Sequence, residues 1–277
     1  MAKTRIIGVI SGKGGVGKTT IVSNLGVLLS AKYGLRTLLI DGNISTSNLG
    51  LHLGLIKPPV SVQDLLSGLS TSIRSNHAIY VHRSGVHIIP ASLSLDHKDD
   101  HSTDYLASRF SRIISDVREK YDVIIIDSAA GLGSETRAAI QSVDEIILVT
   151  VPELPTITAA IKVSEVAKLA GKKLSGIVLN KFRNRDFEIP VEQIEANCGA
   201  KVIAFIPEDI AIPESTCFRE PVVLHAPQSR SSRALETLAE KLLNIKKEKG
   251  PSLLDRLRSR WRAFRERLPK LPKRQKG

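Results

Sequence analysis

One octapeptide constrains this chain more than any other feature of its sequence. Residues 12–19, GKGGVGKT, match the pattern G-x-x-x-x-G-K-[ST] and lie between a short apolar run and a segment with helical periodicity. In that setting the glycines let backbone N–H groups turn toward phosphate oxygens, and the following helix adds the positive end of its dipole. Lys18 can reach the β- and γ-phosphates, and the Thr19 hydroxyl can ligate Mg²⁺. The sequence predicts a nucleotide-binding loop rather than a glycine-rich turn that merely packs tightly.

Apolar runs and helical periodicity alternate along the chain. We expect strands at residues 5–11, 36–41, 86–90, 122–127, 145–151, 174–179 and 201–206. We expect helices at residues 18–31, 104–120, 134–142, 156–170 and 229–246. Several of the strands are continuously apolar, which is typical of a parallel sheet covered on both faces. The pattern predicts an α/β fold with one doubly wound, mostly parallel sheet flanked by helices.

A carboxylate ends the strand expected at residues 122–127. The segment YDVIIID at 121–127 is an apolar run that finishes in Asp127. We expect Asp127 to hold Mg²⁺ together with the Thr19 hydroxyl, directly or through water. Taken alone, Asp127 could equally cap a helix at a strand end, but the phosphate-binding loop favours the metal role. Gly131 follows four residues later, where a loop that senses the γ-phosphate would lie.

The loop contains Lys13 in addition to Lys18, and this additional lysine is not needed to bind one nucleotide. With this lysine, the chain resembles the deviant-Walker-A ATPases of the MinD/ParA family between about residues 6 and 243. The matching stretches are SGKGGVGKTT, LLIDGNISTSNLGLHLGL, VHIIPAS, YDVIIIDSAAG, DEIILVTVPE, GIVLNK, AFIPED and REPVV. The resemblance implies a protein that uses ATP and Mg²⁺ and forms an ATP-dependent homodimer. In that dimer Lys13 would reach the phosphates of the partner subunit and neutralise charge much as an arginine finger does.

The resemblance also assigns the rest of the nucleotide site. It implies that Asn180 hydrogen-bonds the adenine and that the segment at 207–209 flanks the base. The residues expected to contact the nucleotide are Gly12, Lys13, Gly14, Gly15, Val16, Gly17, Lys18, Thr19, Thr20, Asn180, Pro207 and Asp209. From its position alone, Asn180 could also be a turn residue that ends its strand.

Three positions depart from the family pattern. Where the family has D-x-D, this chain has Asp41 and Asn43, and the family's second Asp positions or activates the attacking water. An amide cannot accept that proton and carries no charge, so we expect ATP binding with slow or absent hydrolysis. The other departures are the segment DSAAG at 127–131, which contains Ala130 and where the family has DSPAG, and Val151, where Asn is usual; both leave the identity of the protein partner open. The residues expected to act in catalysis are Lys13, Lys18, Asp41 and Asn43.

Composition and cysteine content exclude several other classes. The chain has 277 residues, of which 42% are hydrophobic and 25% charged, and its apolar runs are far shorter than a membrane helix of about 20 residues. With no secretory signal, this predicts a cytoplasmic protein. Cys198 and Cys217 lie 19 residues apart, which argues against the cluster cysteines of Mrp-type carriers and of the nitrogenase iron protein. We interpret His97 and His101 as part of a solvated loop rather than a metal site.

The net charge of +12 is concentrated at the C-terminus. Residues 246–277 carry 13 Lys and Arg against three acidic residues, so the remainder is nearly neutral. On a helix at about 100° per residue, six apolar side chains share an arc of about 100°, opposite six arginines. They are Leu253, Leu254, Leu257, Trp261, Phe264 and Leu268. We expect an ATPase domain at 1–248 and, at 249–277, a basic amphipathic helix that lies in an anionic membrane interface.

Together with these features, the resemblance implies a MinD-like ATPase, cytoplasmic and peripheral on the inner face of the cell membrane. Its ATP-bound dimer would position or recruit an unidentified partner assembly, such as division, motility or chemotaxis machinery. Two other targets for the tail stay open, a groove on a protein and DNA phosphates. The alternatives are therefore a ParA-like DNA-binding partition ATPase and a hydrolysis-deficient, ATP-dependent scaffold.

Overall fold

A computed structural model of the chain describes residues 3–67, 74–93 and 102–245. In this part of the chain eight strands form one sheet in the order β3-β4-β2-β5-β1-β6-β7-β8, and only the pairing of β3 with β4 is antiparallel. The strands are β1 (Arg5–Ser11), β2 (Thr37–Gly42), β3 (Tyr80–Val81), β4 (His87–Ile89), β5 (Val123–Ala130), β6 (Glu145–Thr150), β7 (Lys173–Phe182) and β8 (Val202–Pro207). The predicted α/β class with a mostly parallel sheet is confirmed.

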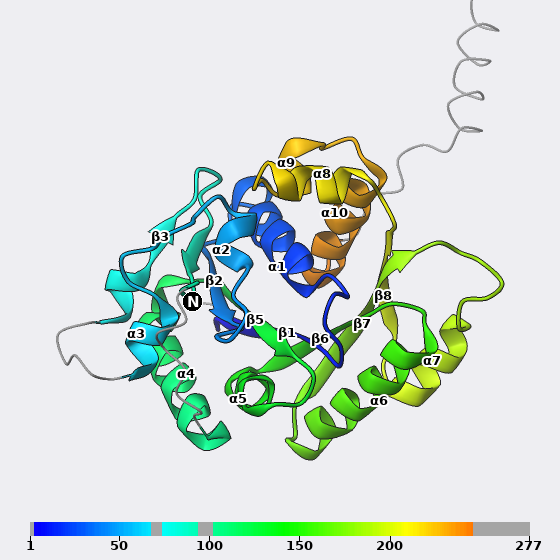
Figure 1. Cartoon of the computed structure of the whole chain (residues 1–277), viewed down its shortest axis with the longest axis horizontal. Helices are drawn as coiled ribbons and strands as arrows, with labels where there is room; N and C mark the ends of the chain where they lie inside the picture. Colours follow the sequence, from blue (N-terminus) through cyan, green and yellow to red (C-terminus); the bar gives the residue numbers. More distant parts are fainter. Residues whose placement is uncertain (1–2, 68–73, 94–101, 246–277) are drawn as a thin grey trace, which may run out of the picture. The chain divides into compact units, whose positions relative to one another are not determined.

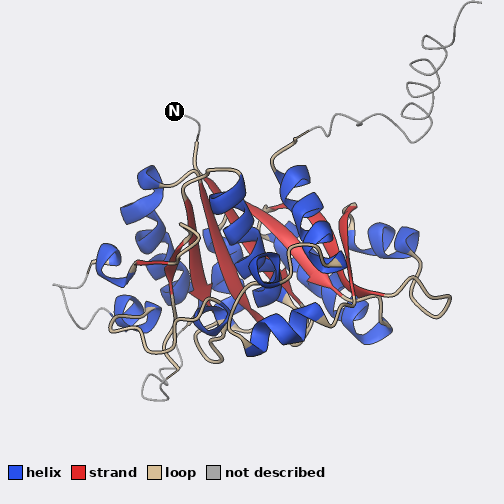
Figure 2. Ribbon diagram, turned by 90° about the horizontal axis from the view of Figure 1, so that it is seen from above, coloured by secondary structure: helices blue, strands red, loops and turns tan. Residues whose placement is uncertain are grey.

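Helices cover both faces of the sheet (Figures 1 and 2). Helices α4 to α7 lie on one face, and α1, α2, α8 and α9 lie on the other (Figure 1). The α-helices are α1 (Lys18–Val27), α2 (Leu49–His52), α3 (Val62–Ser67), α4 (Thr103–Val117), α5 (Ser134–Ser142), α6 (Leu154–Leu169), α7 (Val191–Cys198), α8 (Ala211–Cys217), α9 (Val222–His225) and α10 (Arg230–Leu242). Shorter turns are η1 (Leu28–Lys32), η2 (Ser75–Ala78) and η3 (Arg118–Lys120).

The central strands are apolar because both of their faces are covered. Every residue of β2 and of β6 is buried, as are the first six residues of β5. Since the central strands are parallel, their carboxyl ends meet at one edge of the sheet. There β2 and β5 pair in register, so that Asp41 lies directly opposite Asp127. The loop of residues 12–17 leaves β1 at the same edge.

The sequence expectations differ from the structure at the ends of some elements and in the shortest elements. The helix expected at 18–31 is α-helical only to Val27 and continues as the π-helical turn η1. The edge strand β3 and the helices α2, α3, α7, α8 and α9 were not predicted. All of these elements have eight residues or fewer, too short for periodicity to distinguish them from loops.

The chain divides into a compact unit, Met1–Ala239, and a second unit, Glu240–Gly277. The predicted boundary at residue 248 and the predicted amphipathic helix lie outside the described residues, as do His97 and His101. The boundary and the membrane role of this tail therefore stay predictions.

Candidate nucleotide-binding site

The loop between β1 and α1 needs glycine for two separate reasons. Gly15 and Gly17 have φ angles of 75° and 93°, in the left-handed region that side chains disfavour. Gly12 is required for space, because a Cβ there would lie 2.3 Å from the backbone oxygen of Ala159. Gly17 is the residue before the first turn of α1, so the loop delivers its N–H groups to the N-terminus of a helix. This is the backbone arrangement that cradles phosphate.

Lys18 lies buried beneath the loop. Its Nζ donates a hydrogen bond to Ser11 Oγ at 2.9 Å, and Ser11 Oγ donates to the carbonyl of Lys13 at 2.8 Å. Burial lowers the pKa of the Lys18 ammonium, and the nearby Asp127 carboxyl opposes that shift. Among the described residues Ser11 is the only hydrogen-bond partner of this ammonium, which has three donors. Lys18 thus keeps donors for an anion that enters the loop.

Two buried carboxyl groups lie next to the loop. Asp127 Oδ2 accepts a hydrogen bond from Thr19 Oγ1 at 2.7 Å, whereas its other oxygen, Oδ1, is buried without a partner in the described part of the chain. Burial raises the pKa of Asp127 to about 7, with a further contribution from Asp41. Burial likewise raises the pKa of Asp41 to about 6. A cation would relieve both effects, so Thr19 and Asp127 fit Mg²⁺.

The loop at 43–48, which follows β2, is held in a closed turn. Asp41 accepts hydrogen bonds from the Asn43 N–H at 3.1 Å, from Ser47 Oγ at 2.7 Å and from the Leu49 N–H at 3.3 Å. The Asn43 amide donates to the Thr46 carbonyl at 2.7 Å and accepts from Thr46 Oγ1 at 2.9 Å. Both polar atoms of the Asn43 side chain are therefore engaged within the loop itself. In this conformation Asn43 acts as a turn residue.

The end of β7 braces the phosphate-binding loop from the other side. Asn180 Nδ2 donates to the Val16 carbonyl at 2.7 Å, and Lys181 Nζ donates to the Gly15 carbonyl at 2.9 Å. Asn180 and Lys181 thus bind the carbonyls of Val16 and Gly15, so that the backbone N–H groups of the loop can bind phosphate. Asn180 Oδ1 is buried and has no partner among the described residues, so it can accept a hydrogen bond from an adenine amino group.

The segment that follows β8 completes the site. Pro207 ends the strand, and Asp209 uses both carboxylate oxygens to hold backbone N–H groups, that of Ala211 at 3.0 Å and that of Ser231 at 2.9 Å. Glu208 pairs with Arg183 at 2.6 Å on the surface. The expected contact of Asp209 with a base would therefore involve its backbone rather than a free carboxylate.

A cavity of about 960 Å³ unites these elements. Its lining includes these predicted site residues: Gly14, Gly15, Gly17, Lys18, Thr19, Thr20, Asn43, Asn180, Pro207 and Asp209. Five other predicted residues do not line it: Gly12 packs on α6, Val16, Asp41 and Asp127 are buried, and Lys13 is exposed. The sequence reasoning missed Lys181, although it directly follows Asn180, and the α8 residues on the opposite wall.

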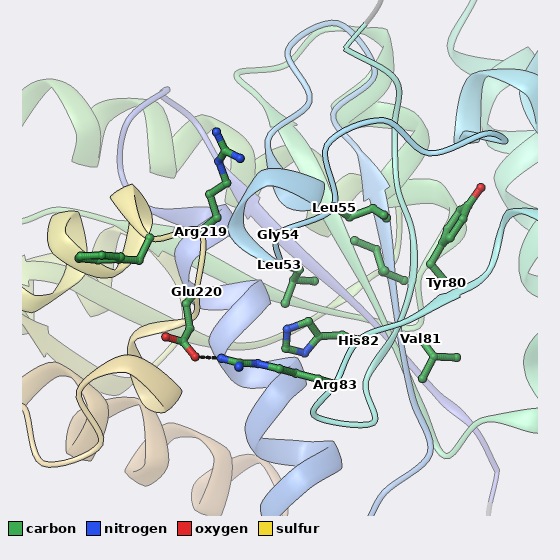
Figure 3. A pocket seen from close by; sticks show the side chains of 11 residues that line it. Leu53, Gly54, Leu55, Tyr80, Val81, His82, Arg83, Arg219 and Glu220 are labelled. Carbon is green, nitrogen blue, oxygen red and sulfur yellow. Dashed lines mark hydrogen bonds and ion pairs between the residues drawn. The ribbon is translucent and has the colours of Figure 1, made fainter.

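A second, smaller cavity of about 430 Å³ lies at the C-terminal ends of α2 and α8 (Figure 3). Leu53 and Phe218, each one residue beyond those helices, contribute to its lining. Arg83 forms an ion pair with Glu220 there, whereas Arg219 points away from both (Figure 3). The charged side chains of this cavity do not converge on a common point.

The described residues contain no group of three or more His, Cys, Asp or Glu that could hold a metal ion. Cys198 is buried on α7, where burial raises the pKa of its thiol to about 11, and Cys217 is exposed at the end of α8. None of the described helices is both long and apolar enough to span a membrane.

The fold and the site define a P-loop nucleotide-binding protein whose loop carries the additional lysine of the deviant-Walker-A class. A family model described as an AAA domain matches residues 4–175, and one described as 4Fe-4S iron sulfur cluster binding proteins of the NifH/frxC family matches residues 116–259. An uncharacterized ATP-binding protein of Methanocaldococcus jannaschii is 36% identical over 87% of this chain and 89% of its own.

Two solved structures are similar to this chain over most of its length. The septum site-determining protein MinD of Pyrococcus horikoshii, complexed with Mg-ADP, is 35% identical with a TM-score of 0.78, over 89% of this chain and 100% of the other. A MinC:MinD complex of Aquifex aeolicus is 27% identical with a TM-score of 0.76, and the match covers 89% of this chain and 99% of the other. The chain belongs to the MinD/ParA family of P-loop ATPases. ATP and Mg²⁺ are the cofactors of this family, and the site described above fits both.

Proposed function

We propose that this chain is a MinD-like ATPase whose ATP-bound homodimer attaches to the membrane and positions a partner assembly. One observation carries the proposal: a single cavity joins the phosphate-binding loop, Lys18 and Thr19 with Asn180 and Pro207. The loop and Lys18 would hold the phosphates, Thr19 and Asp127 the Mg²⁺, and the free Oδ1 of Asn180 the adenine. When bound, Mg²⁺ would neutralise phosphate charge during hydrolysis.

The position of Lys13 supports action across a dimer. Its side chain is exposed, is not part of the lining of its own cavity, and has no hydrogen-bond partner or ion pair among the described residues. A lysine that served its own nucleotide would be expected to face that cavity, as Lys18 does. We therefore propose that Lys13 reaches the phosphates of a second copy.

The proposed membrane attachment rests on the sequence of residues 249–277. One amphipathic helix binds a membrane reversibly, and two helices held in a dimer bind far better because the second binding event is intramolecular. ATP would thus control attachment by controlling dimerisation, with the protein cytoplasmic or peripheral on the inner membrane face. The complex of MinC with MinD supports the proposal that this chain also binds a protein partner.

The Asn43 turn favours a second candidate within the same class, a hydrolysis-deficient ATP-dependent scaffold. No carboxylate stands at position 43, and the amide that replaces it is occupied by Thr46. Because a general base contributes about 10²–10⁴-fold, we propose hydrolysis that is slow or absent. Such a protein would still dimerise on ATP and would need another event to release it.

Co-sedimentation with anionic liposomes tests the proposal. We expect the full chain to pellet with ATP and Mg²⁺ but not with ADP, and the chain ended after residue 248 to stay in solution. A Trp261→Glu variant, which keeps the length of the tail, should also stay in solution, whereas Ser252→Ala should pellet normally. If the full chain remains soluble and instead retards duplex DNA with ATP at matched salt, the tail is a nucleic-acid arm and the membrane role is wrong.

A further inference from the structure

The first turn of α5 is bonded to two loops that approach the phosphate-binding loop. Thr136 Oγ1 donates to the Ala129 carbonyl at 3.0 Å, and Arg137 Nε donates to the Leu132 carbonyl at 2.9 Å. These bonds hold the turn at 129–133, which leaves the end of β5. The residue before them, Glu135, points its carboxylate to the other loop, at 43–48. Three consecutive side chains therefore join α5 to both loops.

Glu135 makes two contacts with the loop at 43–48. Its Oε2 accepts a hydrogen bond from the Ile44 N–H at 3.0 Å, and its Oε1 accepts one from Ser45 Oγ. The two donors directly follow Asn43, which lines the nucleotide cavity. Glu135 is half-buried and Ser45 is exposed, so the contact lies at the rim of the site.

The other loop held by α5 touches the phosphate-binding loop. The Gly131 N–H donates to the Ser11 carbonyl at 3.1 Å, and a Cβ built on Gly14 would lie 3.9 Å from the Ala130 Cβ. Ala130 itself lines the nucleotide cavity. A continuous set of contacts thus runs from the phosphate-binding loop through residues 130–131 and α5 to the residues beside Asn43.

We propose that Glu135 is a positioning residue that makes the protein distinguish ATP from ADP. This inference rests on the proposed nucleotide-binding function. The two loops that Glu135 and its neighbours join line the same cavity as the phosphate-binding loop, through Asn43 and Ala130, and ATP differs from ADP by the γ-phosphate that this cavity would hold. With Glu135 in place the loop at 43–48 is already ordered, so ATP binding does not have to order it. Because ADP lacks the γ-phosphate, its binding depends less on the loop at 43–48, and the affinity of the protein for ADP is nearly independent of Glu135.

The chemistry of the side chain makes the proposal specific. An ionised carboxylate can accept from both donors at once, whereas the amide of glutamine has a single oxygen acceptor and an NH₂ group that faces a donor. Hydrogen bonds to an ionised acceptor are also stronger than those to a neutral one. Glu135→Gln should therefore keep part of the effect and Glu135→Ala none of it. Ser45→Ala removes one exposed donor and should give a smaller change in the same direction.

The test compares the dissociation constants of ADP and ATPγS, measured by calorimetry with Mg²⁺ on the full chain. For Glu135→Ala we expect ATPγS to bind about tenfold more weakly while ADP affinity changes by less than about twofold. Glu135→Gln and Ser45→Ala should fall between this variant and the wild type. Glu165→Gln, which removes an exposed carboxylate on α6, is the matched control and should change neither constant.

Two results would overturn the inference. If ADP and ATPγS weaken together, with a lower melting temperature, Glu135 only stabilises the fold. If neither constant changes in Glu135→Ala or Ser45→Ala, the contact has no role in discrimination. A wild type that binds neither nucleotide would instead refute the proposed function, and this outcome is visible before any variant is compared.

Discussion

Replacing Asp127 with Asn should stabilise the metal-free protein, and more so as the pH rises. Burial first and the neighbouring Asp41 second raise the pKa of Asp127 from its ordinary 3.8 to about 7. The folded state then binds more protons than the unfolded chain between these two values, so the stability that this carboxyl contributes is present at low pH and is lost as pH rises through the folded pKa. At about 1.36 kcal/mol for each pH unit, the loss is about 4 kcal/mol in all and about 3 kcal/mol between about pH 5 and pH 8.

The assay is urea unfolding followed by circular dichroism in EDTA at about pH 5 and about pH 8. The free energy of unfolding of Asp127→Asn, relative to wild type, should rise by about 3 kcal/mol across that interval, because Asn has the shape of Asp but does not ionise. Asp186→Asn, an exposed carboxyl in a loop, is the control and should follow the wild type. A relative stability of Asp127→Asn that does not depend on pH would refute the reasoning. So would a variant that becomes less stable than wild type as the pH rises.

Three further predictions concern the nucleotide. Lys13→Ala should leave monomeric ATP binding intact but abolish the ATP-dependent dimer in size-exclusion chromatography with light scattering, and an unchanged dimer would contradict the trans role. Asn180→Ala should weaken a fluorescent ATP analogue by about tenfold or more, because the loop loses a brace and the adenine an acceptor; affinity equal to wild type would exclude both roles. Asn43→Asp should raise single-turnover hydrolysis by about tenfold or more, and a rate no faster than wild type would show that the missing carboxylate is not what limits the reaction.

The fold, and the grouping of most predicted site residues around one cavity, could be predicted from the sequence because they depend on local features. A phosphate-binding loop must follow a strand and open a helix, so its eight residues predict their own surroundings. The proximity of Thr19 to Asp127 followed from the same logic, since a neighbouring apolar run leads into that carboxylate, whereas Ser11, the partner of Lys18, was not predicted. The short helix α8 could not be predicted, because seven residues with a proline carry no helical periodicity, although it forms a wall of the cavity.

Contacts that depend on the direction of a side chain could not be predicted from the sequence either. Glu135 is one of many acidic residues on a helix, and only the fold shows that it is bonded to Ile44 and Ser45, some 90 positions earlier. Lys181 follows a residue already assigned to the adenine, yet its bond to Gly15 depends on a left-handed backbone with a φ of 51°. Asp209 was expected near the base, and its carboxylate proved to be committed to backbone N–H groups.

The sequence and the structure indicate different effects of Asn43. In the sequence it marks the loss of a carboxylate that handles the attacking water. In the structure its amide donates to the Thr46 carbonyl, a contact that an ionised Asp could not make because it has no donor. The loop is thus held by Asp41 from inside, by Asn43 within itself and by Glu135 from outside. A loop ordered in advance reduces the entropy that ATP binding must overcome, while the chemical step gains nothing from it. This combination favours a protein that binds ATP firmly and hydrolyses it slowly.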